Sequence, residues 1–160
     1  MTVVNLADLI RVASARNGNK IAIRSEDVEE SYLQLDERSS RVAQMLISFG
    51  INRGALIGFL SKNRIEFFDI LFGVAKSGAA TVPINWRLAE SEVTRVLQDA
   101  NPRVLFVDKD LDHLFDRRDL ASRGTTIIDL PNTCEEWIIM LSQFDVVDPL
   151  VEIEQDDVMY

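Results

Sequence analysis

The sequence predicts an α/β fold, in which a layered, mainly parallel sheet is flanked by helices. Short apolar runs alternate along the chain with helical segments of ten or more residues, the pattern typical of right-handed crossovers between parallel strands. Residues 63–88 show the pattern most clearly, because a helix, a break of small residues and a buried strand follow one another there. With 47% apolar and 27% charged residues, the 160-residue chain suits one domain.

The first third of the chain is expected to form two helices separated by a hairpin. The predicted elements are a helix over 6–15, a strand over 20–24, an acidic turn over 26–30, an extended pair at 31–32 and a helix over 33–49. Asn5 is the expected N-cap of the first helix, and Gly50 the C-terminal cap of the second. The hairpin is expected at the edge of the sheet.

The middle of the chain contains the elements expected to form the sheet. They are strands over 56–60, 81–84 and 104–107, with helices over 64–77 and 89–100 between them. Asn63 is the expected N-cap of the helix over 64–77. Pro83 lacks an N–H for strand pairing, so its strand is expected to end there or to lie at an edge.

The helix over 64–77 is apolar nearly all round, which predicts that it is covered on several sides. Its polar positions are Glu66, Asp69, Gly73 and Lys76, which form a narrow stripe. We expect Gly73 on the exposed stripe beside a close neighbour, because an unneeded glycine costs a helix about 1 kcal/mol. The three phenylalanines of this helix are expected in the core.

After the third strand, the pattern predicts three further elements and an acidic tail. They are a charged helical turn over 111–120, a strand over 127–130 and a helix over 135–144 with Trp137 facing inward. Ligands of parallel sheets gather at the carboxyl ends of the strands. Those ends are expected at residues 61–63, 85–87 and 108–109, and after Leu130.

Charge and motif content exclude several classes of function. The net charge of −9 opposes nucleic acid and anionic membranes as general partners. No segment is apolar enough to span a bilayer, and the start lacks a signal peptide, so a cytoplasmic protein is expected. Cys134 and His113 are single residues of their types, so we expect no disulfide, metal centre or catalytic triad. Acidic pairs at 29–30 and 156–157 are expected in solvent.

Three motifs occur in order along the chain. Residues 31–35 read SYLQL, Asn63 is followed by Glu66 and Phe67, and residues 76–88 read KSGAATVPINWRL. This series resembles the amino-terminal part of the acyl-adenylate-forming ligases, the superfamily of AMP-binding enzymes. Its members carry T-Y-x-E-L, then N-x-x-E-F, then K-x-G-A-x-x-V-P-[LI]-[ND]. In spacing and order the resemblance covers the whole chain.

The third motif narrows the resemblance to one subgroup. Residues 85–88, NWRL, are similar to the NWRL or NPRL of fatty-acid and aryl-acid CoA ligases, whereas adenylation domains for amino acids tend to have Asp-Pro there. Gln34 replaces the usual acid of the first motif, at a position without a chemical role in the family. The resemblance implies joining of a carboxylate to ATP with Mg²⁺, and then acyl transfer to the thiol of coenzyme A.

The resemblance also implies that most of the family's machinery lies beyond this chain. Tyr160 falls where family members begin the phosphate loop Tyr-Thr-Ser-Gly-Thr-Thr-Gly. We therefore expect residues 1–160 to be a single amino-terminal subdomain of a larger ligase, ending at the start of the missing phosphate loop and inactive alone. The alternative is a truncated, non-catalytic module that self-associates through apolar faces left exposed by the loss of the remaining fold.

Five residues are candidates for binding coenzyme A. In relatives, the loop after the strand over 81–84 lies near the nucleotide end of that cofactor, which implicates Asn85, Trp86 and Arg87. Arg87 would contact a phosphate and Trp86 would offer a stacking face. In the alternative interpretation, Trp86 packs on a helix and Arg87 pairs with an acid such as Glu90. The two further candidates for a cofactor phosphate are Arg117 and Arg118.

Overall fold

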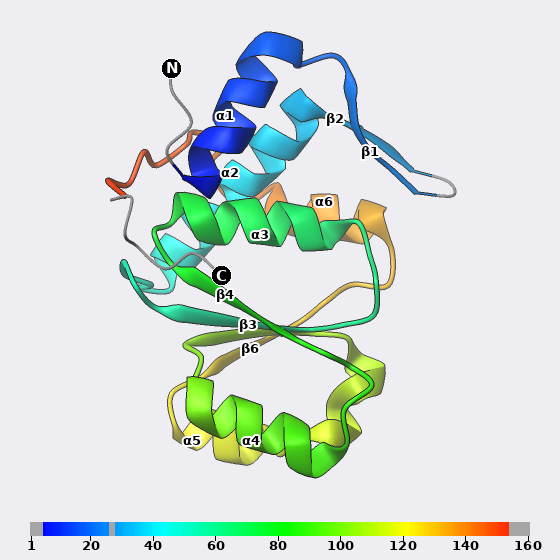
Figure 1. The fold of residues 1–160 in the computed structure, drawn as a ribbon, viewed down its shortest axis with the longest axis vertical. Helices are drawn as coiled ribbons and strands as arrows, with labels where there is room; N and C mark the ends of the chain where they lie inside the picture. Colours follow the sequence, from blue (N-terminus) through cyan, green and yellow to red (C-terminus); the bar gives the residue numbers. More distant parts are fainter. Residues whose placement is uncertain (1–4, 26–27, 154–160) are drawn as a thin grey trace.

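The computed structural model describes residues 5–25 and 28–153 and contains a four-stranded parallel sheet (Figure 1). Its strands, in the order β4-β3-β5-β6 across the sheet, are β4 (Ala80–Ile84), β3 (Leu56–Leu60), β5 (Val104–Val107) and β6 (Thr126–Asp129). The predicted α/β class is confirmed. Pro83 lies in the edge strand β4, which has a neighbouring strand on one side only, so the missing N–H can face the unpaired side.

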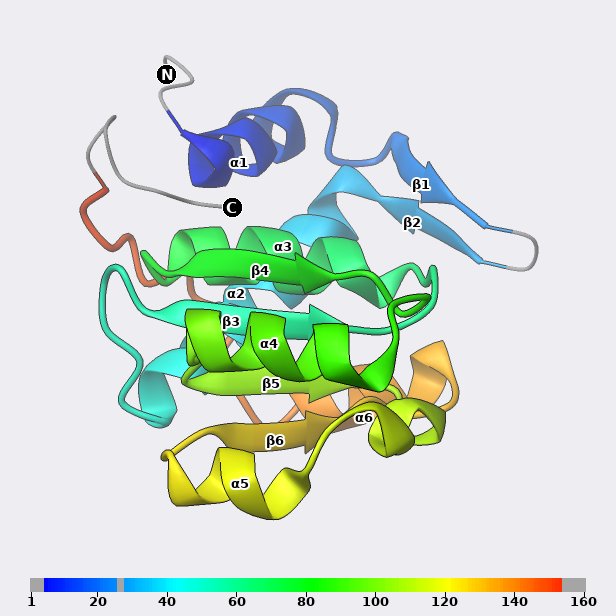
Figure 2. The same cartoon turned by 60° about the horizontal axis from the view of Figure 1, so that its bottom comes forward.

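Helices cover both faces of the sheet (Figure 2). One face carries α4 (Glu90–Ala100), the 3₁₀ helix η1 (Lys109–Leu114) and α5 (Arg117–Ser122). The other carries α2 (Tyr32–Ser48), α3 (Glu66–Lys76) and α6 (Cys134–Leu141). Residues 57–60 of the central strand β3 are buried, as the apolar run predicts, because the strand faces a core on each side.

The amino-terminal elements differ in part from the prediction. Helix α1 (Leu6–Asn17) has Asn5 as its N-cap, with Asn5 Oδ1 accepting from the Asp8 N–H at 2.9 Å. Strands β1 (Ile21–Arg24) and β2 (Glu29–Ser31) pair antiparallel as a separate two-stranded sheet. The prediction that this hairpin lies at the edge of the main sheet is therefore wrong.

The physical reason lies in the junction between β2 and α2. Ser31 ends the strand and is at once the N-cap of the helix, which begins at Tyr32. Ser31 Oγ accepts from the Gln34 N–H at 3.2 Å, and Gln34 Oε1 accepts from the Ser31 N–H at 2.9 Å. The strand therefore runs directly into α2, and Ala22 and Ile23 of the hairpin pack on helical residues instead of the main sheet. Gln34 in the first motif thus has a structural role that either Gln or Glu can fill.

Helix α3 begins later than predicted, and its polar stripe faces inward. Asn63 does not cap it: the N-cap is Ile65, and no side chain bonds the first turn. Within the stripe, Glu66, Asp69 and Lys76 are buried, so an exposed stripe is wrong. The expected close neighbour of Gly73 is confirmed, because α2 packs directly against it. Among the phenylalanines, Phe72 is buried and Phe67 partly buried, whereas Phe68 is 38% exposed.

The polar stripe is buried because α2, the hairpin and α6 supply its partners. Lys76 Nζ donates to Asp36 Oδ1 at 2.5 Å and to Ser40 Oγ at 2.8 Å. Asp69 Oδ2 accepts from the indole N–H of Trp137, the inward residue of α6, at 2.8 Å. Glu30 is also fully buried, so its predicted exposure to solvent is wrong; Asp156, Asp157 and Tyr160 lie outside the described residues.

The segment over 145–153 returns to the amino-terminal half of the chain. Asp148 accepts from Arg11 Nε at 2.8 Å and from Arg11 Nη2 at 2.9 Å. The Nζ of Lys76 lies 3.5 Å from the same carboxylate. Lys76 therefore joins α3 to both α2 and this segment, which gives the lysine of the third motif a structural function.

Candidate functional site

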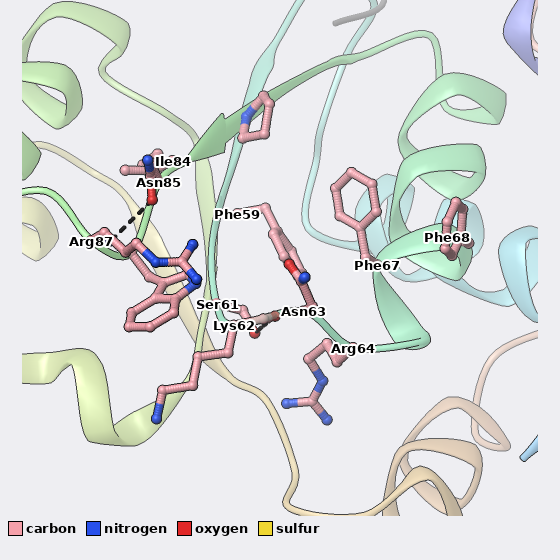
Figure 3. Close-up of a pocket in the computed structure, with 12 residues that line it drawn as sticks. Phe59, Ser61, Lys62, Asn63, Arg64, Phe67, Phe68, Ile84, Asn85 and Arg87 are labelled. Carbon is pink, nitrogen blue, oxygen red and sulfur yellow. Dashed lines mark hydrogen bonds between the residues drawn. The ribbon is translucent and has the colours of Figure 1, made fainter. Parts of the chain in front are cut away.

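A cavity of about 620 Å³ opens beside the carboxyl ends of β3 and β4 (Figure 3). Residues 83–87 line one side and Phe67 and Phe68 of α3 line the other, with the loop over 61–64 between them. Parallel β3 and β4 end side by side, because Leu60 pairs with Ile84. The cavity thus lies at the edge where α/β sheets place their ligands.

The loop after β4 presents an aromatic face with cations beside it. The guanidinium carbon of Arg87 lies 4.3 Å from the centre of the Trp86 ring, and Lys62 Nζ lies 5.8 Å from it. Asn85 Oδ1 accepts from the Arg87 N–H at 3.0 Å, which fixes the turn. Trp86 is half-buried against the core beneath α4, whereas Arg87 is exposed.

Asp108, directly after β5, holds the loop that follows β3. Its Oδ2 accepts from the Lys62 N–H at 2.9 Å, and its Oδ1 accepts from Arg64 Nη1 at 2.7 Å. Ser61 Oγ donates to the same carboxylate at 2.5 Å. This one carboxylate therefore sets the path of residues 61–64, the loop that leads into α3.

Acidic partners favour the charged forms of Arg64 and Lys62 beside the cavity. Burial disfavours the charged Arg64 guanidinium, but hydrogen bonds to Glu66 and Asp108 outweigh this and raise its pKa. A 2.6 Å hydrogen bond between Lys62 Nζ and Asp110 Oδ2 raises the pKa of the lysine and lowers that of the aspartate. Lys62 and Arg87 thus offer positive charge to an anionic ligand, whereas the Arg64 guanidinium is engaged by Glu66, Asp108 and the backbone oxygen of Pro131.

Chemically, the cavity is suited to binding rather than to bond cleavage. Lys62 and Arg87 can contact phosphate oxygens, and the indole of Trp86 can support a planar ring. His113 Nδ1 contacts the backbone oxygen of Asp110, and neither it nor Cys134 lines the cavity. In residues 5–25 and 28–153, no group of three or more His, Cys, Asp or Glu side chains could hold a metal ion.

The structure brings three of the five predicted residues together. Asn85, Trp86 and Arg87 line the cavity, and Arg87 stacks on Trp86 instead of pairing with Glu90. Arg117 and Arg118 lie elsewhere, on α5.

Arg117 contacts Asp129 at the end of β6 and donates to Asp112 at 2.6 Å. Arg118 is exposed. Lys62 and Asp108 lie in two of the strand ends predicted from the sequence, residues 61–63 and 108–109, but no local pattern revealed that Asp108 holds the Lys62 loop.

Comparison with known proteins identifies relatives over most of the chain. The model of the AMP-binding enzyme family matches residues 10–160. The fatty acid–[acyl-carrier-protein] ligase ScoC of Streptomyces coeruleorubidus is 34% identical over 116 residues, covering 72% of this chain and 22% of ScoC. The long-chain-fatty-acid–CoA ligase FadD13 of Mycobacterium tuberculosis is 35% identical over 114 residues, covering 71% of this chain and 22% of FadD13.

Solved structures of adenylate-forming ligases share the fold of this chain. The N-terminal domain of FACL13 from Mycobacterium tuberculosis superimposes with a TM-score of 0.81 at 27% identity, covering 98% of this chain and 40% of that one. MatB from Rhodopseudomonas palustris superimposes with a TM-score of 0.85 at 19% identity, covering 99% of this chain and 32% of that one, and supports the fold alone. The chain spans about a fifth of the length of the curated relatives. None of the helices described has the length and apolar character to cross a membrane.

Proposed function

Because the chain belongs to the family of AMP-binding enzymes, we propose that it forms the amino-terminal part of an ATP-dependent ligase that activates fatty or related carboxylic acids. The observation that carries this is the family match over residues 10–160, together with relatives named for ligating fatty acids. In the complete reaction, the carboxylate attacks the α-phosphorus of ATP in the presence of Mg²⁺, forms an acyl-adenylate and releases pyrophosphate. A thiol then attacks the acyl carbon and releases AMP.

Coenzyme A is the acceptor thiol that we propose. The relatives include both CoA ligases and an acyl-carrier-protein ligase, so the family alone leaves the acceptor open. Coenzyme A carries a phosphorylated adenosine, and the cavity offers the indole of Trp86 with Arg87 and Lys62 beside it. Arg117 and Arg118 remain candidates for a second phosphate contact, outside this cavity.

The 160-residue chain is inactive alone under this proposal. Its cavity binds and orients, and among the described residues no group of three or more His, Cys, Asp or Glu side chains could hold Mg²⁺. The purified chain, given ATP, Mg²⁺ and a fatty acid, therefore releases no pyrophosphate above a protein-free blank. Stoichiometric pyrophosphate release that scales with chain concentration would contradict this.

Binding of coenzyme A can be measured on the chain itself. We expect coenzyme A to change the fluorescence of Trp86, and Arg87→Gln to weaken the affinity about tenfold, since one charge-assisted contact is worth about 1.5 kcal/mol. The matched control is Arg95→Gln on the exposed side of α4, which leaves the affinity unchanged. Equal affinities for both variants and the parent chain would exclude the Trp86 loop as the site.

A self-associating, non-catalytic module remains the alternative function. It is favoured by large apolar side chains left exposed, among them Ile139 at 64% and Val147 at 61%. In a cytoplasmic ligase, which we propose here, the remaining parts of the enzyme cover such residues. Sedimentation at micromolar concentration separates the two: a monomer favours the ligase part, and a tight dimer favours the module.

A further inference from the structure

Two carboxyl groups meet in the interior where the hairpin and α6 pack on the α2–α3 pair. Glu30 comes from β2 and is 0% exposed, and Asp69 comes from α3 and is 1% exposed. Neither group belongs to the cavity at the carboxyl ends of the sheet. The two residues therefore need a separate explanation, since isolated buried carboxylates are strongly unfavourable.

One guanidinium serves both carboxyls. Arg38 of α2 donates from Nε to Glu30 Oε1 at 2.9 Å, and the same nitrogen lies 3.3 Å from Asp69 Oδ2. Trp137 of α6 donates its indole N–H to Asp69 Oδ2 at 2.8 Å. The remaining oxygens, Glu30 Oε2 and Asp69 Oδ1, are buried and have no hydrogen-bond partner in the part of the chain described.

The other titratable groups facing this cluster add no positive charge. Cys134 of α6 lies with its Sγ 3.9 Å from Arg38 Nη1. Glu66, one turn before Asp69 on α3, is engaged by Arg64 at 2.9 Å. With both carboxyls ionised, the cluster formed by Glu30, Arg38 and Asp69 would carry a net negative charge in the interior.

A single proton would remove both the net negative charge and the lack of hydrogen-bond partners. Placed between the two carboxyls, it makes the cluster neutral and turns one carboxyl oxygen into a donor to the other carboxyl group. Burial and the nearby charge of Glu30 raise the pKa of Asp69 well above its ordinary value, against the opposing effects of Arg38 and Trp137. This direction agrees with the geometry.

We propose that Glu30 and Asp69 share one proton in the folded chain, and that this proton is a pH-sensitive lock holding the hairpin and α6 against the α2–α3 pair. Each element contributes one group: β2 the glutamate, α3 the aspartate, α2 the arginine and α6 the indole. Loss of the proton leaves two carboxylates repelling each other across that junction. The hairpin and α6 are the elements that can move apart to admit water.

The sign of the pH dependence follows from the raised pKa. The folded state holds a proton that the opened state releases, so the contribution to docking is complete below the ordinary carboxyl pKa. It is lost as pH rises through the raised value. Within that interval, the equilibrium constant for opening rises up to about tenfold for each pH unit.

Hydrogen exchange of the full chain between about pH 5 and pH 8, corrected for intrinsic exchange rates, tests the lock. In the parent chain, we expect the protection factors of amides in α6 and the hairpin to fall by up to about tenfold for each unit of rising pH. The protection factors of amides in β3 stay constant. Asp69→Asn and Glu30→Gln each mimic the protonated partner, so the pH dependence disappears in both. Glu29→Gln, at the exposed neighbour in β2, keeps it.

A carboxyl-carbon NMR titration of the parent chain does not depend on any variant folding. We expect one carboxyl of the pair to titrate well above the ordinary range, with the assignment made from whichever of the two variants folds. Titration of both carboxyls in the ordinary range would overturn the shared proton. A pH dependence of protection that is equal in the parent chain and in Asp69→Asn would overturn the lock.

Discussion

Substitution of Gly73 by alanine tests why α3 has a glycine in its interior. A Cβ atom at this position would lie 2.5 Å from Val42 Cβ and 2.8 Å from the backbone oxygen of Ser39. Both distances are far below ordinary van der Waals contact, which begins at 3.4 Å. Because one obstacle is backbone, the side chains cannot simply rotate away, and α2 and α3 must separate by roughly 1 Å.

The expected magnitude combines two opposing terms. Overpacking of this kind costs about 3 kcal/mol, the upper end of the usual range, and alanine returns about 1 kcal/mol through its better helix propensity. Gly73→Ala therefore lowers the free energy of unfolding by about 2 kcal/mol, or the melting temperature by about 4–8 °C. Urea unfolding followed by circular dichroism measures the change.

Gly54 supplies the control, because its glycine is required by backbone conformation and not by a close neighbour. Its φ is +79°, and nothing lies within 4 Å of an added Cβ, so alanine there costs only the strain of a left-handed backbone. Asparagine tolerates that conformation, so Gly54→Asn costs less than Gly54→Ala. At position 73 the loss of stability grows with the size of the new side chain, so Gly73→Ser costs more than Gly73→Ala. A Gly73→Ala chain as stable as the parent would refute the close-packing explanation.

Three further predictions concern charged groups. Lys76→Met leaves Asp36 without the partner that lies at 2.5 Å, so we expect the free energy of unfolding to fall by about 2 kcal/mol. Urea unfolding measures this change, and an unchanged unfolding midpoint would contradict it. Burial opposes the charge of Asp148, but the hydrogen bond from Arg11 prevails and lowers the pKa of the carboxyl. The contribution of Asp148 to the stability of the fold is therefore present above the ordinary carboxyl pKa and is lost as pH falls through the lowered value. Asp148→Asn then exposes residues 145–153 to proteolysis at neutral pH, whereas unaltered cleavage would exclude the tether. Asp108→Asn weakens coenzyme A binding several-fold by loosening residues 61–64, and an affinity equal to that of the parent chain would exclude this positioning role.

The two central strands of the sheet, β3 and β5, were predictable from sequence because they are buried on both faces. Runs such as residues 56–60 and 104–107 are apolar without interruption, and no tertiary information is needed to recognise them. The cavity loop over 85–87 was predictable for a related reason: it follows such a strand directly, at the ligand-binding edge.

Other features depended on partners distant in sequence. The stripe on α3 is buried because Arg38, Trp137 and Asp36 lie on other elements, which no local pattern reveals. Asn63 has the residue type of a cap, but Asp108, more than forty positions later, holds its loop instead. The hairpin was placed at the sheet from its β pattern alone, which says nothing about which strands pair.

Transplantation of this chain into a complete relative is the most direct test of the ligase assignment. Residues of FadD13 that match this chain are replaced by it, and pyrophosphate release and acyl-CoA formation are measured with ATP, Mg²⁺ and a long-chain fatty acid. We predict that the hybrid carries out both steps, and that Arg87→Gln within it slows acyl-CoA formation while pyrophosphate release continues. A hybrid that folds, shown by circular dichroism and cooperative melting, but forms no acyl-adenylate would contradict the account.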